Sequence, residues 1–263
     1  MLKIDFHTHG KLAKNLPFSE EYTVQLFKEA KARGLDALCL TEHFNTQEFE
    51  KIYGYITEHY PKDGDTYLVE GVRVFPGLEV DIQEGGHNLV IGRFEDILEI
   101  RRRVLPEPDE AFLPAEDLFS IIKEYNVLFG AAHVYRSGCN NLALSEDLID
   151  CYDFFDLNGK DTGLMGLSNR KNIEAIAAKY NKPVLAGSDT HQYLQYGVLY
   201  NDFDKDVNTI DALKYEIEKK AYTVEIDKGI SQKVEAATLL KKALKELQKV
   251  GGRYDINLAK VKL

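Results

Sequence analysis

The chain has 263 residues, of which 44% are hydrophobic and 29% are charged, and its formal net charge is −10. This composition is typical of a folded globular protein, and the acidic balance disfavours binding to long nucleic acid, which requires clustered Lys and Arg. The cysteines Cys39, Cys139 and Cys151 are far apart and form no Cys-x-x-Cys pair, so neither a disulfide framework nor a thiolate zinc site is suggested.

No stretch reaches the roughly 18 continuous apolar residues that a membrane span requires, and residues 1–10 do not resemble a signal peptide. We therefore expect a cytoplasmic protein with no membrane partner. Barrels of alternating strands and helices reach this length as one domain. One domain over residues 1–263 is the expectation, with a helical C-terminal completion at about 205–250.

Short apolar runs alternate with helical stripes, a pattern typical of repeated strand-helix units and a largely parallel sheet. The runs predict strands at Leu2–Phe6, Ala37–Leu40, Val74–Val80, Asn88–Gly92, Val127–Ala132, Phe154–Leu157, Pro183–Ala186 and Tyr222–Ile226.

Helix signals lie between and after these strands. Ser19 is a suitable N-cap for a helix that ends at Gly34, and Ser231 for a final helix through Val250. Apolar residues at i, i+3, i+4 and i+7 predict two more helices that pack on the sheet. These residues are Phe49, Ile52, Tyr53 and Ile56 in one helix and Leu118, Ile121, Ile122 and Tyr125 in the other.

Histidines and acidic residues gather beside the predicted strands. His7 and His9 follow the first strand, where alternate side chains point the same way and can converge on one ion. Further motifs are Thr41-Glu42-His43, Gly77-Leu78-Glu79-Val80-Asp81, Gly86-His87-Asn88, Ala132-His133-Val134 and Gly187-Ser188-Asp189-Thr190-His191. In a parallel barrel, residues beyond the strand ends share one rim, although His87 precedes its strand. Imidazole and carboxylate suit divalent transition metals, so the motifs predict a multinuclear metal centre.

In this order the motifs resemble those of the PHP family, the polymerase and histidinol phosphatase group of metal-dependent phosphoesterases. The resemblance covers roughly residues 1–200 and includes Thr-Glu-His where the family often has Thr-Asp-His. It implies an α/β fold, a distorted TIM-like (β/α)7 barrel with the metal site at the C-terminal rim of its strands. It also implies two or three divalent ions, which could be Zn, Mn or Fe because mixed nitrogen and oxygen ligands accept all three.

The resemblance also implies a ligand set. A first metal would be bound by His7, His9, Glu79 and Asp189, a second by Glu79, His87 and His133 with Glu79 bridging, and a third would involve His43 and His191. The family usually supplies another ligand a few residues after His-x-His, whereas residues 10–15 contain no His or Asp.

Arg136 and His191 are the expected catalytic residues. Arg136 lies three residues beyond His133, and its planar guanidinium group can form two hydrogen bonds to one phosphate. The alternative is that Arg136 forms a salt bridge at the surface. Lys11, Lys14 and Lys160 are further candidates for a phosphate contact.

Other polar residues are expected to be structural. These are Glu42 as an acceptor that orients its neighbours, His59 at a solvated helix end, Asp81, Asn158 in a turn with Gly159 with a place at the rim as the alternative, Cys139 as a buried thiol, and a solvated Lys-rich helix at 241–249.

The expected function is hydrolysis of a small phosphate monoester, of the histidinol phosphate, nucleotide or sugar phosphate class, by metal-activated water. One alternative is an exonuclease or phosphodiesterase on short oligonucleotides, and another is a non-catalytic metal-binding partner module. Hydrolysis of amides or lactones ranks lowest, because related barrels use a bridging carboxylated lysine where this chain has Glu79.

Overall fold

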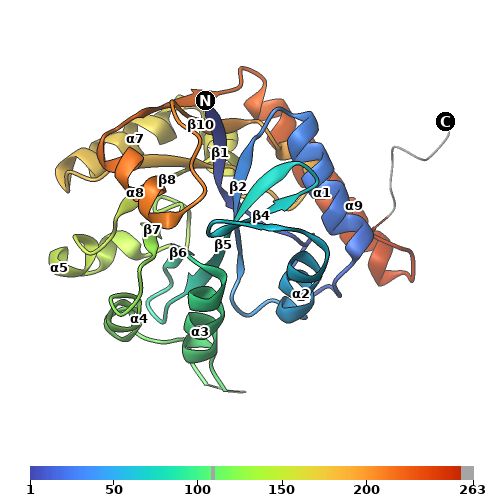
Figure 1. Cartoon of the computed structure of the whole chain (residues 1–263), viewed down its shortest axis with the longest axis horizontal. Helices are drawn as coiled ribbons and strands as arrows, with labels where there is room; N and C mark the ends of the chain where they lie inside the picture. The colour runs from blue at the N-terminus through green and yellow to red at the C-terminus, as the bar shows by residue number, and fades with distance from the viewer. Residues whose placement is uncertain (108–109, 256–263) are drawn as a thin grey trace.

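The structure is a computed structural model that describes residues 1–107 and 110–255. Within these residues nine strands of an eleven-stranded sheet follow the order β11-β10-β1-β2-β5-β6-β7-β8-β9, and β3 and β4 branch off this path at β5. Helices are arranged around the sheet (Figure 1). The strands are β1 (Leu2–Thr8), β2 (Ala37–His43), β3 (Lys62–Asp63), β4 (Thr66–Val69), β5 (Val72–Asp81), β6 (His87–Ile91), β7 (Leu128–Ala131), β8 (Phe154–Asn158), β9 (Val184–Gly187), β10 (Leu199–Phe203) and β11 (Tyr222–Ile226). Every predicted strand is present.

The two ends of the path from β1 to β9 meet and nearly close a barrel. Thr8 and Thr190 form a parallel bridge, and the backbone N–H of Asp189 donates to the carbonyl of His7 at 2.7 Å. Gly187 permits this approach, because a Cβ at its position would lie 2.3 Å from the Cβ of His7. The expected distorted TIM-like barrel is therefore confirmed.

The sheet is less parallel than expected. β6 pairs antiparallel with both β5 and β7, because the chain turns back in a tight hairpin in which the N–H of Ile82 donates to the carbonyl of Gly86. Gly85 in that hairpin has φ +90°, which glycine adopts without strain. The reversal brings the start of β6 to the rim where β5 ends. His87 therefore reaches that rim although it precedes its strand.

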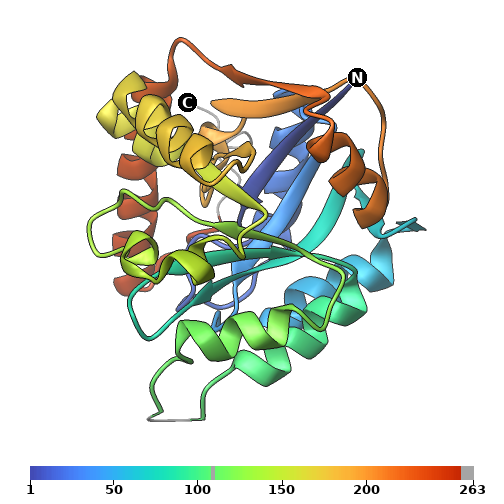
Figure 2. The ribbon, with the colours of Figure 1, turned by 90° about the vertical axis from the view of Figure 1, so that its left-hand side faces the viewer.

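Three strands have no counterpart in the prediction. The hairpin β3-β4 extends from β5, and β10 lies between β1 and β11, antiparallel to both. Figure 2 shows the orange β10 and β11 beside the dark blue β1. β3 has two exposed residues and β10 places polar residues between apolar ones, so neither gives a strong apolar run.

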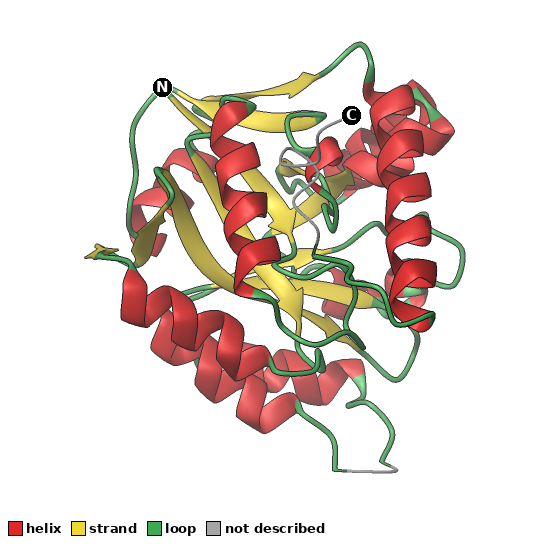
Figure 3. Cartoon of the chain, turned by 90° about the vertical axis from the view of Figure 1, so that its right-hand side faces the viewer, coloured by secondary structure: helices red, strands yellow, loops and turns green. Residues whose placement is uncertain are grey.

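Helices pack around the outside of the strands (Figure 3). They are α1 (Glu20–Ala32), α2 (Phe49–His59), α3 (Phe94–Val104), α4 (Ala115–Ile122), α5 (Glu146–Ile149), α6 (Gly159–Met165), α7 (Leu167–Lys179), α8 (Ile210–Glu218) and α9 (Ile230–Lys249), with 3-10 turns η1 (Asn141–Ala143) and η2 (Tyr193–Gln195).

The helix ends agree with the sequence in part. Ser19 caps α1 as predicted, and its hydroxyl accepts the N–H of Tyr22. The prediction for Ser231 is wrong: this residue lies inside α9, which begins directly after Gly229 with no side-chain cap. α4 ends at Ile122, so Tyr125 lies beyond it.

The barrel interior below the rim is apolar. Phe6 of β1 packs edge-on against Phe154 of β8 with ring centroids 6.2 Å apart, although β9 separates these strands in the sheet. Ile4, Phe75 and the α8 residue Leu213 belong to the same buried cluster. The polar side chains at the rim therefore rest on a close-packed support that limits their movement.

α9 docks beside the loops of the rim. Its Val234 lies against Gly163 of α6, where a Cβ would come within 2.7 Å of the valine Cγ2. After α9, the ring of Tyr254 packs edge-on against Tyr22 of α1, with centroids 5.5 Å apart. The turn η2 lies between the two helices and packs against both α1 and α9. These contacts fix which face of α9 is turned to the barrel.

Replacing Gly163 by alanine is expected to destabilise the protein by about 1–3 kcal/mol, because the added methyl group must push α6 and α9 apart. The matched control is Gly54→Ala within α2, where among the described residues no atom lies within 4 Å of the position that the added methyl carbon would take. That change should stabilise by about 0.5–1 kcal/mol through helix propensity. Urea unfolding measures both, and equal effects would contradict the close contact.

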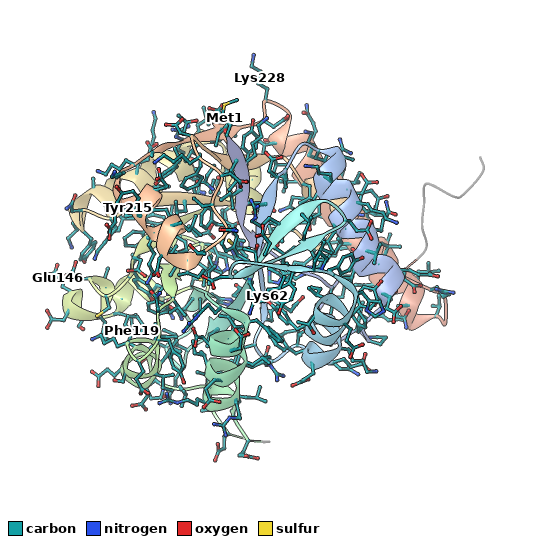
Figure 4. All side chains as sticks on the ribbon, viewed as in Figure 1. Met1, Lys62, Phe119, Glu146, Tyr215 and Lys228 are labelled. Carbon is teal, nitrogen blue, oxygen red and sulfur yellow. The ribbon has the colours of Figure 1, made fainter. Side chains whose placement is uncertain are left out.

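Charged side chains such as Glu146 and Lys228 are exposed and point away from the body of the molecule (Figure 4). Within the described ranges, every helix is too short or too polar to cross a lipid bilayer.

Candidate metal centre

Glu79, near the end of β5, lies at the centre of the rim and is buried. Its two carboxylate oxygens face different sets of histidines. Oε1 lies 2.8 Å from His87 Nδ1 and 3.0 Å from His133 Nε2. Oε2 lies 3.1 Å from His43 Nδ1, 3.4 Å from His9 Nε2 and 3.5 Å from His7 Nε2. One carboxylate thus joins two groups of imidazoles.

Asp189 faces the same space from the loop after β9. Its Oδ1 lies 3.4 Å from His9 Nε2, 3.8 Å from His191 Nε2 and 3.9 Å from His7 Nε2. The backbone of Asp189 has φ +57°, and that of His133 has φ +32°. Non-glycine residues adopt such angles at a cost of about 1–3 kcal/mol, and strain of this kind is often found at functional sites.

Every predicted metal ligand belongs to one of four overlapping donor groups that could hold a metal ion. In each group the candidate ligand atoms lie within 4.8 Å of one another. The groups are His7, His9 and Glu79; His7, His133 and Asp189; Glu79, His87 and His133; and His9, His43 and His191. His59 is exposed at the end of α2, as expected, and contributes to none of them.

The donor atoms fit divalent cations. Among the described residues, His7 Nε2, His9 Nε2, His43 Nδ1 and Glu79 Oε2 are buried without a hydrogen-bond partner. Each such atom costs about 1–3 kcal/mol when it is left unsatisfied. Cations bound between these atoms would satisfy all four at once.

Neighbouring groups orient the imidazoles. His7 Nδ1 lies 3.1 Å from Asp156 Oδ2, and His191 Nδ1 lies 3.0 Å from the carbonyl of Lys11. Because a carbonyl only accepts, His191 Nδ1 bears the proton and the lone pair is on Nε2. Hydrogen bonds of this kind fix the tautomer of metal-binding histidines. The ring of His191 also stacks on that of His9, with centroids 3.9 Å apart.

The electrostatics of the rim keep the carboxylates of Glu79 and Asp189 ionised. Burial would raise the pKa of Glu79, but the imidazoles of His43 and His7 outweigh it and hold this pKa well below its usual range. Against the same effect of burial, Arg136 and His9 hold the pKa of Asp189 well below normal. Burial lowers the pKa of His43 to about 4, so its ring is neutral at pH 7 and offers a lone pair.

Arg136 is ion-paired at the edge of the centre. Its Nη2 donates to Asp189 Oδ2 at 2.7 Å and to Asn158 Oδ1 at 3.0 Å, and its Nε donates to Asp161 Oδ1 at 3.0 Å. Asn158 also begins α6 by accepting the N–H of Asp161, so it both ends β8 at the rim and starts the turn. Neither Asp156 nor Asp161 has a predicted role in the sequence motifs.

Two residues expected to be structural contact the histidines instead. Asp81 Oδ1 lies 3.2 Å from His87 Nδ1. Cys139 is only half-buried, and its Sγ lies 3.2 Å from His133 Nδ1. Glu42 accepts the backbone N–H groups of Gly10 and His43, each at 3.0 Å, and its Oε1 lies 3.6 Å from His9 Nδ1, beyond hydrogen-bond distance.

The first two candidate lysines point to other partners. Lys11 donates its amine to the carbonyl of Gln47, and Lys14 Nζ lies 3.8 Å from Asp81 Oδ2. Lys160, in contrast, lines a cavity of about 200 Å³ that begins at Asp189 and His191.

The Lys-rich part of α9 forms the far wall of that cavity, so the expectation of a purely solvated helix is wrong. Lys241, Lys242 and Lys245 line it together with Ala237, Thr238, Gln192 and Gln195. Burial lowers the pKa of Lys241 to about 8, and the charges of Lys160 and Lys245 lower it further while Asp189 opposes them. The signal in the sequence is the i, i+3, i+4, i+7 spacing from Thr238 to Lys245.

Known structures share this fold. PsfC from Pseudomonas syringae superposes with a TM-score of 0.74 at 20% identity, covering 92% of this chain and 98% of that one. The lesion-specific endonuclease Q of Pyrococcus furiosus gives 0.65 at 21% identity, covering 85% of this chain but 57% of its own. A candidate metal-dependent phosphoesterase from Bifidobacterium adolescentis gives 0.50 at 14%, covering 83% and 96%. At these identities the likeness establishes the fold alone.

No curated protein matches the sequence. The model of the PHP domain, however, matches residues 5–229, which include every motif that forms the rim. The chain therefore belongs to the PHP domain family and has the metal-dependent phosphoesterase fold of that family.

Proposed function

We propose that this protein is a phosphatase that hydrolyses a small phosphate monoester with two or three bound Zn, Mn or Fe ions. The proposal is supported most directly by the position of Glu79. Its two carboxylate oxygens face separate groups of histidines. Such a carboxylate can hold two cations a few ångströms apart. Divalent cations at these positions would acidify water and neutralise charge on the phosphate oxygens.

In this proposal His7, His9, Glu79 and Asp189 hold one ion. Glu79, His87 and His133 hold a second, and His9, His43 and His191 could hold a third. Residues 10–15 add no carboxylate or imidazole, so the third group consists of imidazoles alone. His191 would act through Nε2, because its Nδ1 is bonded to the carbonyl of Lys11.

The small size of the cavity beside the centre and the net charge of −10 favour a small substrate over a long nucleic acid. Arg136 would then serve two purposes. It holds Asp189 in place through Nη2, and the edge of its guanidinium that makes no bond within the described residues is available to a phosphate oxygen.

Replacing Arg136 by alanine is expected to lower kcat/KM for phosphate release by about 10- to 100-fold, the usual loss when a partner that orients a metal ligand is removed. A phosphate contact would appear mainly in KM, and misorientation of Asp189 mainly in the amount of bound metal. The control is Arg170→Ala, which removes an exposed ion pair with Glu174 on α7. Unchanged kinetics for Arg136→Ala would rule out both roles.

The proposed function is tested with purified protein loaded with Mn²⁺ or Zn²⁺. Phosphate release is measured from a panel of nucleoside, sugar and amino-alcohol monophosphates, and p-nitrophenol release from p-nitrophenyl phosphate and from bis-p-nitrophenyl phosphate. Hydrolysis of monoesters well above diesters is expected. Preference for the diester would support a phosphodiesterase instead, and no hydrolysis of either class would overturn the proposal.

A further inference from the structure

The cavity beside the metal centre is lined by four lysines and by one carboxylate, that of Asp189. Lys160, Lys241, Lys242 and Lys245 line it, and within residues 1–107 and 110–255 no carboxylate forms an ion pair with any of them. By contrast Lys233 and Lys249, elsewhere on α9, pair with acidic residues at 3.0 and 2.6 Å. The unpaired lysines of this helix thus face the cavity.

A neutral donor accompanies these charges. Gln192 is 1% exposed and lines the cavity, and its Nε2 is buried without a hydrogen-bond partner of normal geometry among the described residues. Its Oε1 already accepts the N–H of Leu194, which fixes the side chain. The side chain of Tyr193 contacts Gln192 without a well-formed hydrogen bond, so an anionic oxygen in the cavity would complete the hydrogen bonding of Nε2.

The position of the lysines is fixed by packing. Val234 lies against Gly163 of α6, and buried Ala237 and Leu244 belong to the inner face of α9. Lys241 is one turn beyond Ala237, so its side chain is directed along the same face toward Asp189 and His191. Packing keeps the positively charged lysines close together in the folded protein. A bound anion would reduce the repulsion between them.

We propose that this cavity binds a second acidic group of the substrate, a phosphate or a carboxylate, while the phosphate to be released lies at the metal centre. The inference rests on the proposed function and narrows it to small phosphate monoesters that bear another anion. Asp189 and His191 line the cavity and also belong to the donor groups, so one short molecule can span both places.

The test compares two substrates that differ only in the second anion, propane-1,3-diol monophosphate and propane-1,3-diol bisphosphate. The wild type should prefer the bisphosphate in kcat/KM. In the variant Lys241→Ala/Lys245→Ala this preference should fall by roughly 10- to 100-fold, the loss expected when hydrogen bonds to a charged group are removed. Lys249→Ala, which changes an exposed lysine of the same helix outside the cavity, should keep the wild-type preference.

Binding is measured separately by calorimetry on metal-loaded protein with propane-1,3-bisphosphonate and propylphosphonate, which cannot be hydrolysed. A preference for the bisphosphonate that the double variant loses supports the subsite even if no ester is hydrolysed, in which case only the proposed function fails. Hydrolysis of monoesters with no preference for the second anion, or an equal loss in Lys249→Ala, overturns the subsite. Lys245→Ala alone provides the same comparison if the double variant does not fold.

Discussion

Replacement of Glu79 by glutamine is expected to lower kcat/KM for phosphate release by more than about 100-fold, the upper end of what loss of an outer partner of a metal ligand costs. The reason is its central position, with Oε1 3.0 Å from His133 and Oε2 3.1 Å from His43. Glutamine keeps the volume but has no charge to offset two cations. Bound metal per chain, measured by mass spectrometry, should fall together with activity.

A matched control for this substitution is Glu216→Gln. Glu216 is also buried, at 4% exposure, but it lies on α8 and pairs with Lys205 at 3.0 Å, away from the rim. The Glu216→Gln substitution should leave metal content and kcat unchanged. If the Glu79 variant retained the full complement of metal, the bridging role proposed for this carboxylate would be wrong.

Removing metal is expected to produce the second large effect, on stability. A ligand present at 100 times its Kd stabilises the folded state by about 2.7 kcal/mol, and a chain of this size gains about 2–4 °C in Tm per kcal/mol. Zn²⁺ or Mn²⁺ added to chelator-treated protein should thus raise Tm by about 5–10 °C. This gain comes from the buried ligand atoms that have no hydrogen-bond partner, which include His9 Nε2 and Glu79 Oε2.

Calcium serves as the control ion for the melting experiment, because it prefers six to eight oxygen ligands and the rim is rich in imidazole nitrogen. The shift in Tm that calcium causes should be small. The Glu79→Gln variant should also respond weakly to Zn²⁺. An equal shift with calcium, or none with Zn²⁺, Mn²⁺ and Fe²⁺, would contradict the metal centre.

The positions of the donor residues were predictable because they depend on local rules. The alternating run before the first two histidines predicts a strand, and His7 lies near the end of β1 with His9 directly after it. Glu79 lies near the end of β5, and Asp189 follows β9. The resemblance of the motifs then supplied their grouping. In a barrel of parallel strands, residues beyond successive strands share a rim, so the resemblance and the order of the motifs together predict proximity in space. His87 reaches the same rim for another reason, because β6 is antiparallel to its neighbours.

What the sequence could not supply depends on the pairing of distant segments. β6 is antiparallel to its neighbours because of a hairpin, and the pattern of apolar residues does not show the direction of a strand. The contacts of Arg136 with Asp161 and Asp189 depend on how three loops are placed relative to one another, which the sequence does not give. Lys241 reaches the cavity only because Gly163 lets α9 approach α6, a packing detail that periodicity does not reveal.

The seam at which the barrel closes has a consequence for biosynthesis. His7 and Asp189 meet through a backbone hydrogen bond between segments separated by most of the chain. During translation the amino-terminal histidines emerge from the ribosome long before their carboxylate partner does. Such long-range pairing slows folding, because the loop must close before its contacts form. A nascent chain can therefore assemble the complete set of donor side chains only after residue 191 has left the exit tunnel.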